Sequence, residues 1–250
     1  MATERARVHG SRWSVAAAAT GVGFAALALI AFLVAGGPSD TSAEGIANYF
    51  AANDTAVEWQ AFLFGLSGIF LLWFAGTLAS ALRANDPDVG ARLGGVALAG
   101  AAAATVLYLV GIAGWTTLAH LFADATPGRF SPEALGDSLM IFNLSENSLV
   151  LAGFGAATFV GAASLALLSA RMLPDWLAWA GGLVVALLVV NAFVQLVGGG
   201  AAGDALGIGS FLAFVAWVLA ASILLSRWSA RAAAAPPLGA EGAPAAAAGP

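Results

Sequence analysis

The sequence predicts an all-α fold, a polytopic membrane bundle of six transmembrane helices with both termini in the cytoplasm. Of the 250 residues, 60% are hydrophobic and only 9% are charged, with a mean hydropathy of +0.89, whereas a soluble domain carries about 25% charged residues. The few charges also divide the chain into uncharged stretches, each longer than the roughly 20 apolar residues that cross a bilayer as a helix. These stretches are continuously apolar rather than alternating, which disfavours transmembrane strands.

The charged residues and His120 bound each uncharged stretch and so place the six spans in order. We expect them at 15–35, 61–82, 95–117, 148–170, 176–197 and 205–226. The first is longer than the about 7–15 apolar residues of a cleavable signal peptide, and no clear A-x-A site follows, so we interpret it as a retained anchor. The turn Asn85-Asp86-Pro87-Asp88 joins the second and third spans, and a short loop with Pro174 joins the fourth and fifth.

The arginines predict the orientation and the division of the chain into three parts. Cytoplasmic segments would hold Arg5, Arg7, Arg12, Arg83, Arg92, Arg171, Arg227 and Arg231, against Arg129 alone on the other face. Positive charge gathers on the cytoplasmic side of membrane proteins. We therefore predict a cytoplasmic segment at 1–14, the six-helix domain at 15–226, and a cytoplasmic tail at 227–250. The tail is rich in Ala and Pro and cannot build a core, so we expect it to be disordered.

Tryptophan and glycine support the same boundaries. Tryptophan gathers at the two membrane interfaces, and the sequence has Trp13, Trp176, Trp179 and Trp228 at the inner one, with Trp59 and Trp115 at the outer one. Trp73 and Trp217 fall near mid-depth and are interpreted as packing residues. The many glycines of the spans are interpreted the same way, because lipid provides no hydrophobic drive between helices and close backbone approach must supply the contact energy.

Two further helix starts precede spans on the outer side. Thr41-Ser42-Ala43-Glu44 fits a capping box, and the following Ile46, Tyr49 and Phe50 share one helical face. This short helix would lie either on the membrane interface or on the ends of the other helices. Ser131-Pro132 starts a second segment that runs toward the fourth span, with Gly136 as a candidate break.

Composition excludes several chemistries. The chain has no Lys and no Cys, so a lysine Schiff base and a thiolate nucleophile or ligand are excluded. His9 and His120 are the only histidines, and neither falls within a span where it would ligate haem. No loop is long enough for a nucleotide-binding domain. We expect no cofactor, no metal site and no nucleic-acid partner; the expected partners are the lipid bilayer and, as an open alternative, another membrane protein.

One short motif suggests an enzyme. Gly65-Leu66-Ser67-Gly68 resembles the G-x-S-G nucleophile motif of rhomboid intramembrane proteases, which also have six-helix cores. A serine nucleophile needs a general base within hydrogen-bond reach. His120 is the only candidate near the outer side, and we expect it at the surface rather than at the depth of Ser67.

Uncharged and acidic polar residues gather in the outer half of the predicted bundle. The residues that we predict to form a pocket are Glu58, Gln60, His120, Glu146, Asn147, Asn191 and Gln195. Thr116, Thr117 and Asn143 lie at similar depth. Polar groups at membrane depth are costly and face the bundle interior. The group predicts a small pocket that opens to the outer face. The alternative is interhelical hydrogen bonding together with ordinary interfacial residues.

A nine-residue segment between the fourth and fifth spans carries a resemblance to a family. Leu173-Pro174-Asp175-Trp176-Leu177-Ala178-Trp179-Ala180-Gly181 resembles the L-P-x-W-L-G-W-x-G segment of an uncharacterised group of bacterial membrane proteins with about six helices, a domain of unknown function. Ala178 replaces the glycine of that pattern. The resemblance implies the plasma membrane of a bacterium and supplies no activity.

Together these features predict a multi-pass integral membrane protein without enzymatic activity. It would bind a partner or lipid, or act as an accessory protein, through its extracytoplasmic face. A small transporter or permease is the second hypothesis, and an intramembrane hydrolase is the third. A transporter would be expected to carry a helix break or an embedded charge, and no Asp, Glu or Arg lies within the six spans.

The orientation can be tested with reporter fusions. An alkaline phosphatase reporter is active only outside the cytoplasm, so fusion after Arg231 should give no activity. Insertion of the reporter near Asp124 should give strong activity. Strong activity at the C-terminal fusion would mean an odd number of spans and would contradict the predicted topology.

Overall fold

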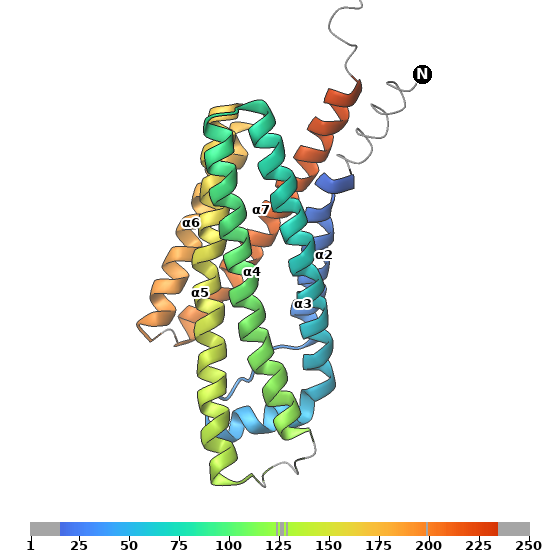
Figure 1. The fold of residues 1–250 in the computed structure, drawn as a ribbon. Helices are drawn as coiled ribbons and strands as arrows, with labels where there is room; N and C mark the ends of the chain where they lie inside the picture. The colour runs from blue at the N-terminus through green and yellow to red at the C-terminus, as the bar shows by residue number, and fades with distance from the viewer. Residues whose placement is uncertain (1–15, 124, 126–127, 129, 199, 235–250) are drawn as a thin grey trace, which may run out of the picture.

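The computed structural model describes residues 16–123, 125, 128, 130–198 and 200–234. The regular structure of this part of the chain is all-helical, and six helices are long and apolar enough to span a membrane. They are α2 (Thr20–Val34), α3 (Ala43–Asn85), α4 (Val89–Phe122), α5 (Pro132–Ala170), α6 (Asp175–Leu196) and α7 (Gly200–Ala234) (Figure 1). The predicted all-α class with six membrane-spanning helices is confirmed. The predicted N-terminal segment, Arg129 and residues 235–250 of the predicted tail lie outside the described residues.

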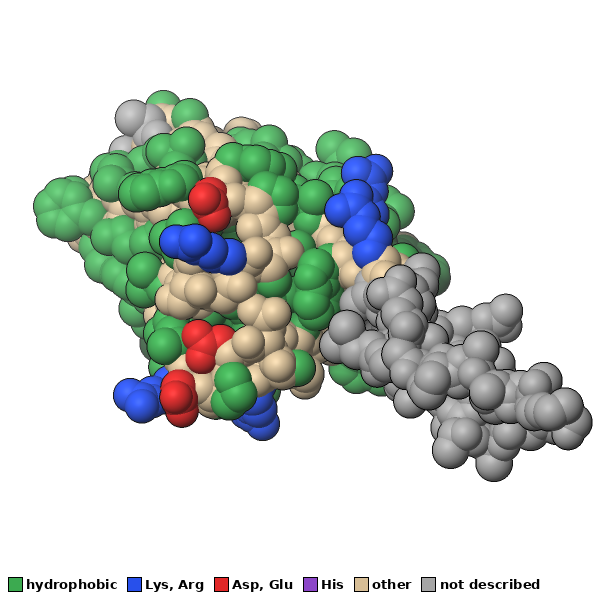
Figure 2. Space-filling model, turned by 90° about the horizontal axis from the view of Figure 1, so that it is seen from above, with side chains coloured by type: hydrophobic (Ala, Val, Ile, Leu, Met, Phe, Trp, Pro, Cys, Tyr) green, Lys and Arg blue, Asp and Glu red, His purple; other side chains and the backbone are tan. Residues whose placement is uncertain are grey.

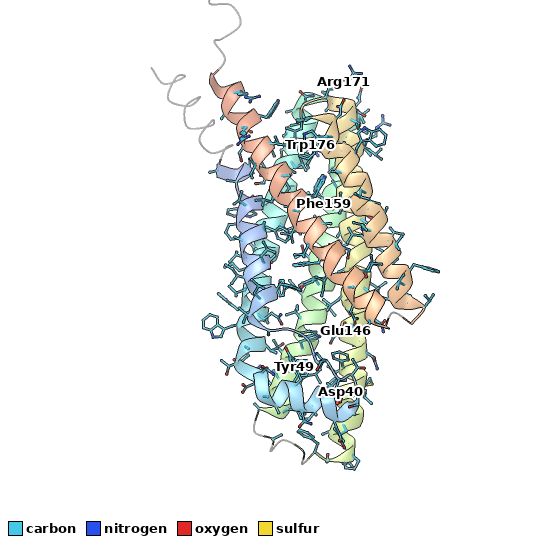
Figure 3. All side chains as sticks on the ribbon, turned by 180° about the vertical axis from the view of Figure 1, so that it is seen from behind. Asp40, Tyr49, Glu146, Phe159, Arg171 and Trp176 are labelled. Carbon is cyan, nitrogen blue, oxygen red and sulfur yellow. The ribbon has the colours of Figure 1, made fainter. Side chains whose placement is uncertain are left out.

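The helices form a closed ring in chain order. Each helix contacts the next, α7 contacts α2, and α3 also contacts α5. The α3–α4 and α5–α6 turns, which adjoin Arg83, Arg92 and Arg171, lie at the same end of the bundle as the last turns of α7, which carry Arg227 and Arg231, and we call it the arginine end (Figures 1 and 3). Figure 2 looks onto this end, where basic and acidic side chains lie among hydrophobic ones. We call the opposite end, which holds Asp40 and Glu146, the acidic end.

Close packing of α4 on α5 depends on glycine. A Cβ atom on Gly100 would lie 2.5 Å from the backbone nitrogen of Phe159, and one on Gly155 would lie 2.5 Å from the backbone nitrogen of Ala104. Real Cβ atoms do not approach a backbone atom so closely, so the two backbones touch only because both residues lack a side chain. These two glycines therefore pack helices, as the sequence predicted.

An aromatic core fills the bundle toward the arginine end. Phe159 makes edge contacts with Phe74, Phe214 and Trp217. The indole N–H of Trp217 donates to the carbonyl of Leu177 at 3.0 Å, which ties α7 to α6. The interpretation of Trp217 as a packing residue is confirmed.

The same interpretation of Trp73 is wrong, because this side chain is 62% exposed on the outside of the bundle. The sequence gives the depth of a residue along its helix. It does not give the side of the helix on which the residue lies.

Helix α2 closes the ring against α7. The hydroxyl of Ser222 donates to the carbonyl of Ala18 at 2.6 Å, and Phe24 packs on the edge of Phe214. A Cβ on Gly21 would lie 2.7 Å from Ser222, so this contact also needs a glycine. The ring is therefore tightest near the arginine end.

The first part of α3 crosses the acidic end of the bundle. Asn53 has non-helical backbone angles (φ −128°, ψ 20°) and separates this part from the spanning part (Figures 1 and 3). Its side-chain amide donates to the carbonyl of Tyr49 at 2.8 Å. Ile46 and Phe50 are fully buried with Leu118, Phe122 and Phe142 in a second small core. Of the two predicted placements, packing on the helix ends is the one observed.

The caps of α3 and α5 explain where these helices begin. The N-cap of α3 is Ser42, one residue after the start of the predicted capping box, and its hydroxyl accepts from the backbone N–H of Gly45 at 3.1 Å. The backbone N–H of Ser42 donates to Asp40 and, with the Ser42 hydroxyl, holds the pKa of Asp40 below its usual value. Ser131 caps α5 as predicted.

Two helices continue past the predicted limits. Helix α5 runs unbroken from Pro132 to Ala170, so Gly136 does not interrupt it. Helix α7 continues from the predicted span end at Ser226 to Ala234. Residues 227–234 of the segment predicted to be a disordered tail are therefore helical.

Replacement of Gly155 by valine should destabilise the bundle. The new Cβ would overlap the backbone of α4, and overpacking of this kind costs roughly 1–3 kcal/mol or more. Gly182→Val is the matched control, because a Cβ on Gly182 of α6 meets no atom within 4 Å. Thermal unfolding in mild detergent should show a melting temperature several degrees lower for Gly155→Val alone. Equal melting temperatures would contradict the packing role of Gly155.

Candidate functional site

A cavity of about 820 Å³ lies inside the ring of helices and extends to the acidic end. Ligand sites for small molecules commonly have volumes of about 300–1,000 Å³. All six helices contribute to its wall, and the lining residues include Phe24, Phe32, Gln60, Phe64, Ser67, Leu71, Thr105, Tyr108, Trp115, Asn143, Glu146, Asn147, Leu188, Asn191, Gln195, Asp204, Gly207, Phe211 and Phe214. The size and the enclosure by every helix make this cavity the candidate site.

The floor of the cavity is apolar. Phe24, Leu71 and Phe214 line its deep part and are themselves buried. They belong to the same hydrophobic core as Phe74 and Phe159, which fills the bundle toward the arginine end. The cavity is therefore accessible from the acidic end and is closed toward the arginine end by packed aromatic side chains.

The polar residues gather nearer the mouth of the cavity. Of the seven residues predicted to form a pocket, five line it: Gln60, Glu146, Asn147, Asn191 and Gln195. Figure 3 shows Glu146 toward the acidic end of the bundle, between Phe159 and Tyr49. Asn143, which the sequence places at similar depth, also lines the cavity, whereas Thr116 and Thr117 bond to the carbonyl of Ala113 on their own helix.

Glu58 and His120 do not line the cavity. They contact each other on the outside of the acidic end, with 3.4 Å between Glu58 Oε1 and His120 Nδ1, and both side chains are at least half exposed. Glu58 precedes Gln60 by two residues, which is roughly 200° around a helix. Because Gln60 faces inward, Glu58 must face outward. Their prediction as pocket residues used depth alone and did not account for this rotation.

Gln60 is buried at the end of α2. Its side chain is only 4% exposed. The amide Nε2 donates to the carbonyls of Ala31 at 3.3 Å and of Ala35 at 2.5 Å. The last carbonyls of a helix have no partner within the helix and must find one elsewhere. Gln60 thus caps the C-terminal end of α2 inside the bundle.

Two carboxylates line the cavity, and the sequence identified only one of them. The indole N–H of Trp115 donates to Glu146 Oε1 at 3.1 Å, so Trp115 faces the cavity rather than forming part of the predicted outer belt. Asp204 lines the cavity from the first turns of α7. In the sequence it served only as a boundary between two spans. The signal in the sequence that could have identified Asp204 as a cavity residue was its position between the apolar runs of the fifth and sixth spans.

Asn191 and Gln195 line the cavity from α6, on the inward side of the helix where the sequence predicts them. Both approach glycines of α7: a Cβ on Gly207 would lie 3.6 Å from Asn191 Oδ1, and one on Gly203 would lie 3.2 Å from Gln195 Oε1. The Oδ1 atom of Asn191 is buried without a hydrogen-bond partner. Asn191 therefore does not use this oxygen to join helices, which weakens the alternative of simple interhelical bonding.

The serine motif has no base beside it. Ser67 is 3% exposed, and its hydroxyl donates to the carbonyl of Phe64 on the same helix at 2.8 Å. His120, the candidate base, is paired with Glu58 on the outside. The structure does not bring this serine and histidine together. The described residues also contain no group of three or more His, Cys, Asp or Glu side chains that would hold a metal ion.

These features define a multi-pass membrane protein with an open, polar-rimmed cavity at one end. Comparison of the chain with models of protein families, with curated proteins and with solved structures finds no match. The likeness of the segment at 173–181 to a bacterial family thus rests on those nine residues alone.

Gln60 and Asn191 should differ in their contribution to stability. Gln60→Leu leaves two buried carbonyls without a donor, which costs about 1–3 kcal/mol. Asn191→Leu removes a buried oxygen that has no partner and should leave the melting temperature unchanged or higher. Thermal unfolding of the two variants in the same detergent measures the difference. If Asn191→Leu lowers the melting temperature as much as Gln60→Leu, Asn191 stabilises the packing of the helices by interhelical hydrogen bonding.

Proposed function

We propose that this chain is a non-enzymatic binding protein that takes a small ligand into the cavity from its extracytoplasmic face, in the plasma membrane of a bacterium. The observation that carries the proposal is the cavity itself, with an apolar floor and polar groups near its mouth. Sites for small molecules combine these two features, because apolar walls supply binding energy and a few polar groups fix orientation. The arginine distribution supports the assignment of the acidic end to the extracytoplasmic side.

A buried polar atom without a hydrogen-bond partner also supports a binding role. A buried acceptor without a hydrogen bond costs free energy. Asn191 Oδ1 is such an acceptor at the cavity wall. A ligand that donates to Asn191 Oδ1 would remove this cost.

A small transporter is the second candidate. A cavity that reaches into the bundle from one end is also what a carrier open to one side presents. Release to the other side would require the contacts of Phe159 with Phe74 and Trp217 to separate. In the described spanning helices the one proline is Pro132, at the first residue of α5, and none lies in a helix interior where it would mark a broken helix. Binding without translocation needs no such rearrangement.

The proposal is tested by filling the cavity. Gly153 lines the cavity, and a Cβ added there meets no atom within 4 Å, so Gly153→Phe should occupy the space without displacing the backbone. Gly182→Phe is the matched control, because Gly182 is also a helical glycine with open space around it but does not line the cavity. The measurement is mass spectrometry of small molecules that remain bound after extraction of the full chain in mild detergent.

We expect the wild type and Gly182→Phe to retain the same bound molecule and Gly153→Phe to lose at least nine-tenths of it. Both variants should elute as a single folded species in gel filtration. A wild type that retains nothing, or a Gly153→Phe variant that retains as much as the wild type, would overturn the proposal.

A further inference from the structure

The charged residues that line the cavity are all acidic. Glu146 and Asp204 line it from α5 and α7, and no described Arg or His residue does. Among the described residues, the one contact between a carboxylate and a basic side chain joins Glu58 and His120, so neither cavity carboxylate has a basic partner. Charged groups at membrane depth are costly unless they are paired or reach water. The cavity is therefore complementary to a positive charge.

The other polar groups of the wall add hydrogen-bond acceptors. Asn191 Oδ1 is buried without a partner. Gln60 uses Nε2 to cap α2, and within the described residues its Oε1 accepts no hydrogen bond. An ammonium group carries positive charge and up to three N–H donors, which suits a wall that offers carboxylates and free amide oxygens.

Below the carboxylates the cavity is lined by aromatic and aliphatic side chains. Phe64 and Tyr108 pack edge to face with 4.9 Å between ring centroids, and both line the cavity together with Phe214. Such a surface binds an alkyl chain through apolar contact. Aromatic rings next to a carboxylate also attract cations through their faces. The ligand must therefore combine a positive group with an apolar part.

The cavity also reaches the lipid-facing surface between α2 and α7. Leu33 and Ile208 both line it, although they are 79% and 47% exposed on the outside of the bundle. Closer to the arginine end this gap is closed by the stacked rings of Phe32 and Phe211, whose centroids are 5.3 Å apart. An amphiphile dissolved in the membrane has a direct route to the cavity at this point.

We infer that the ligand of the cavity is an amphipathic cation, an alkyl ammonium whose positive group lies between Glu146 and Asp204 and whose chain lies on the aromatic floor. This inference rests on the proposed binding function and specifies its ligand class. The described residues place no third His, Cys, Asp or Glu beside the two carboxylates as a further metal ligand. The ammonium belongs either to a free amine or to the headgroup of a lipid such as phosphatidylethanolamine.

The test uses n-octylammonium as the probe and the full chain in a neutral maltoside detergent. Binding is measured by isothermal titration calorimetry, with n-octanol and n-octyl sulfate as probes of the same chain length and different charge. We expect octylammonium to bind the wild type at least tenfold more tightly than octanol and more tightly still than octyl sulfate. This comparison needs no variant and so does not depend on a mutant that folds.

Variants that replace a carboxylate by an amide test which residues bind the ammonium group. Glu146→Gln and Asp204→Asn should each weaken octylammonium binding at least tenfold and leave octanol binding unchanged. Glu58→Gln is the matched control, because Glu58 is also a carboxylate of the acidic end but lies outside the cavity, and its affinity should remain within twofold of the wild type. Unchanged octylammonium affinity in both cavity variants would overturn the inference.

Two further outcomes separate this inference from the proposed function and identify the source of the ammonium. If the wild type binds octanol as tightly as octylammonium and Gly153→Phe abolishes octanol binding, the proposed binding function is supported and the cationic ligand is overturned. If phosphatidylethanolamine displaces octylammonium and phosphatidylglycerol does not, the result would support a lipid headgroup as the ligand. Failure of both lipids to displace it would support a free amine.

Discussion

The structure depends on one constraint of the bilayer, which is that apolar side chains gain nothing by leaving lipid for the interior of the protein. Helices are then held by close backbone contact, aromatic packing and a few hydrogen bonds. In this chain the contacts between Gly100 and Phe159 and between Gly155 and Ala104 hold α4 on α5. The contacts of Gly21 with Ser222 and of Trp217 with Leu177 hold α2, α7 and α6 near the arginine end.

This distribution of contacts leaves the other end of the ring hollow. At the acidic end, α2 and α7 meet through Phe32 and Phe211, and beyond these rings glycines and amide side chains line the wall together with Leu33 and Ile208. A hollow bundle exposes the ends of its helices, and their carbonyls need donors. Gln60 supplies two hydrogen bonds to the end of α2, so one polar side chain both maintains the wall and forms part of the cavity.

The depth of each residue could be predicted from the sequence, but its direction around the helix could not. Charged residues bound the apolar runs, so the six spans followed from their positions, and the inward side of Asn191 and Gln195 followed from the cost of amides in lipid. Glu58, Trp73 and Trp115 were misassigned because each lies at the predicted depth on the opposite side of its helix from the expected one. Asp204 was overlooked because a charge at the end of a span is ordinarily solvated. The crossing of α3 depends on a single non-helical residue, Asn53, in an otherwise continuous helical pattern.

The charge asymmetry of the whole molecule supports the ligand class inferred for the cavity. Eight carboxylates lie in the described segments of the acidic end, namely Asp40, Glu44, Asp54, Glu58, Glu133, Asp137, Glu146 and Asp204. No arginine is described there, whereas the arginine end holds Arg83, Arg92, Arg171, Arg227 and Arg231. Clustered charge of one sign around a cleft raises the local concentration of oppositely charged solutes and their rate of association. Six of these carboxylates lie outside the cavity, where salt screens their long-range attraction, so they would attract a cation without binding it tightly. Glu146 and Asp204, at the wall of the cavity, are the two that would retain it.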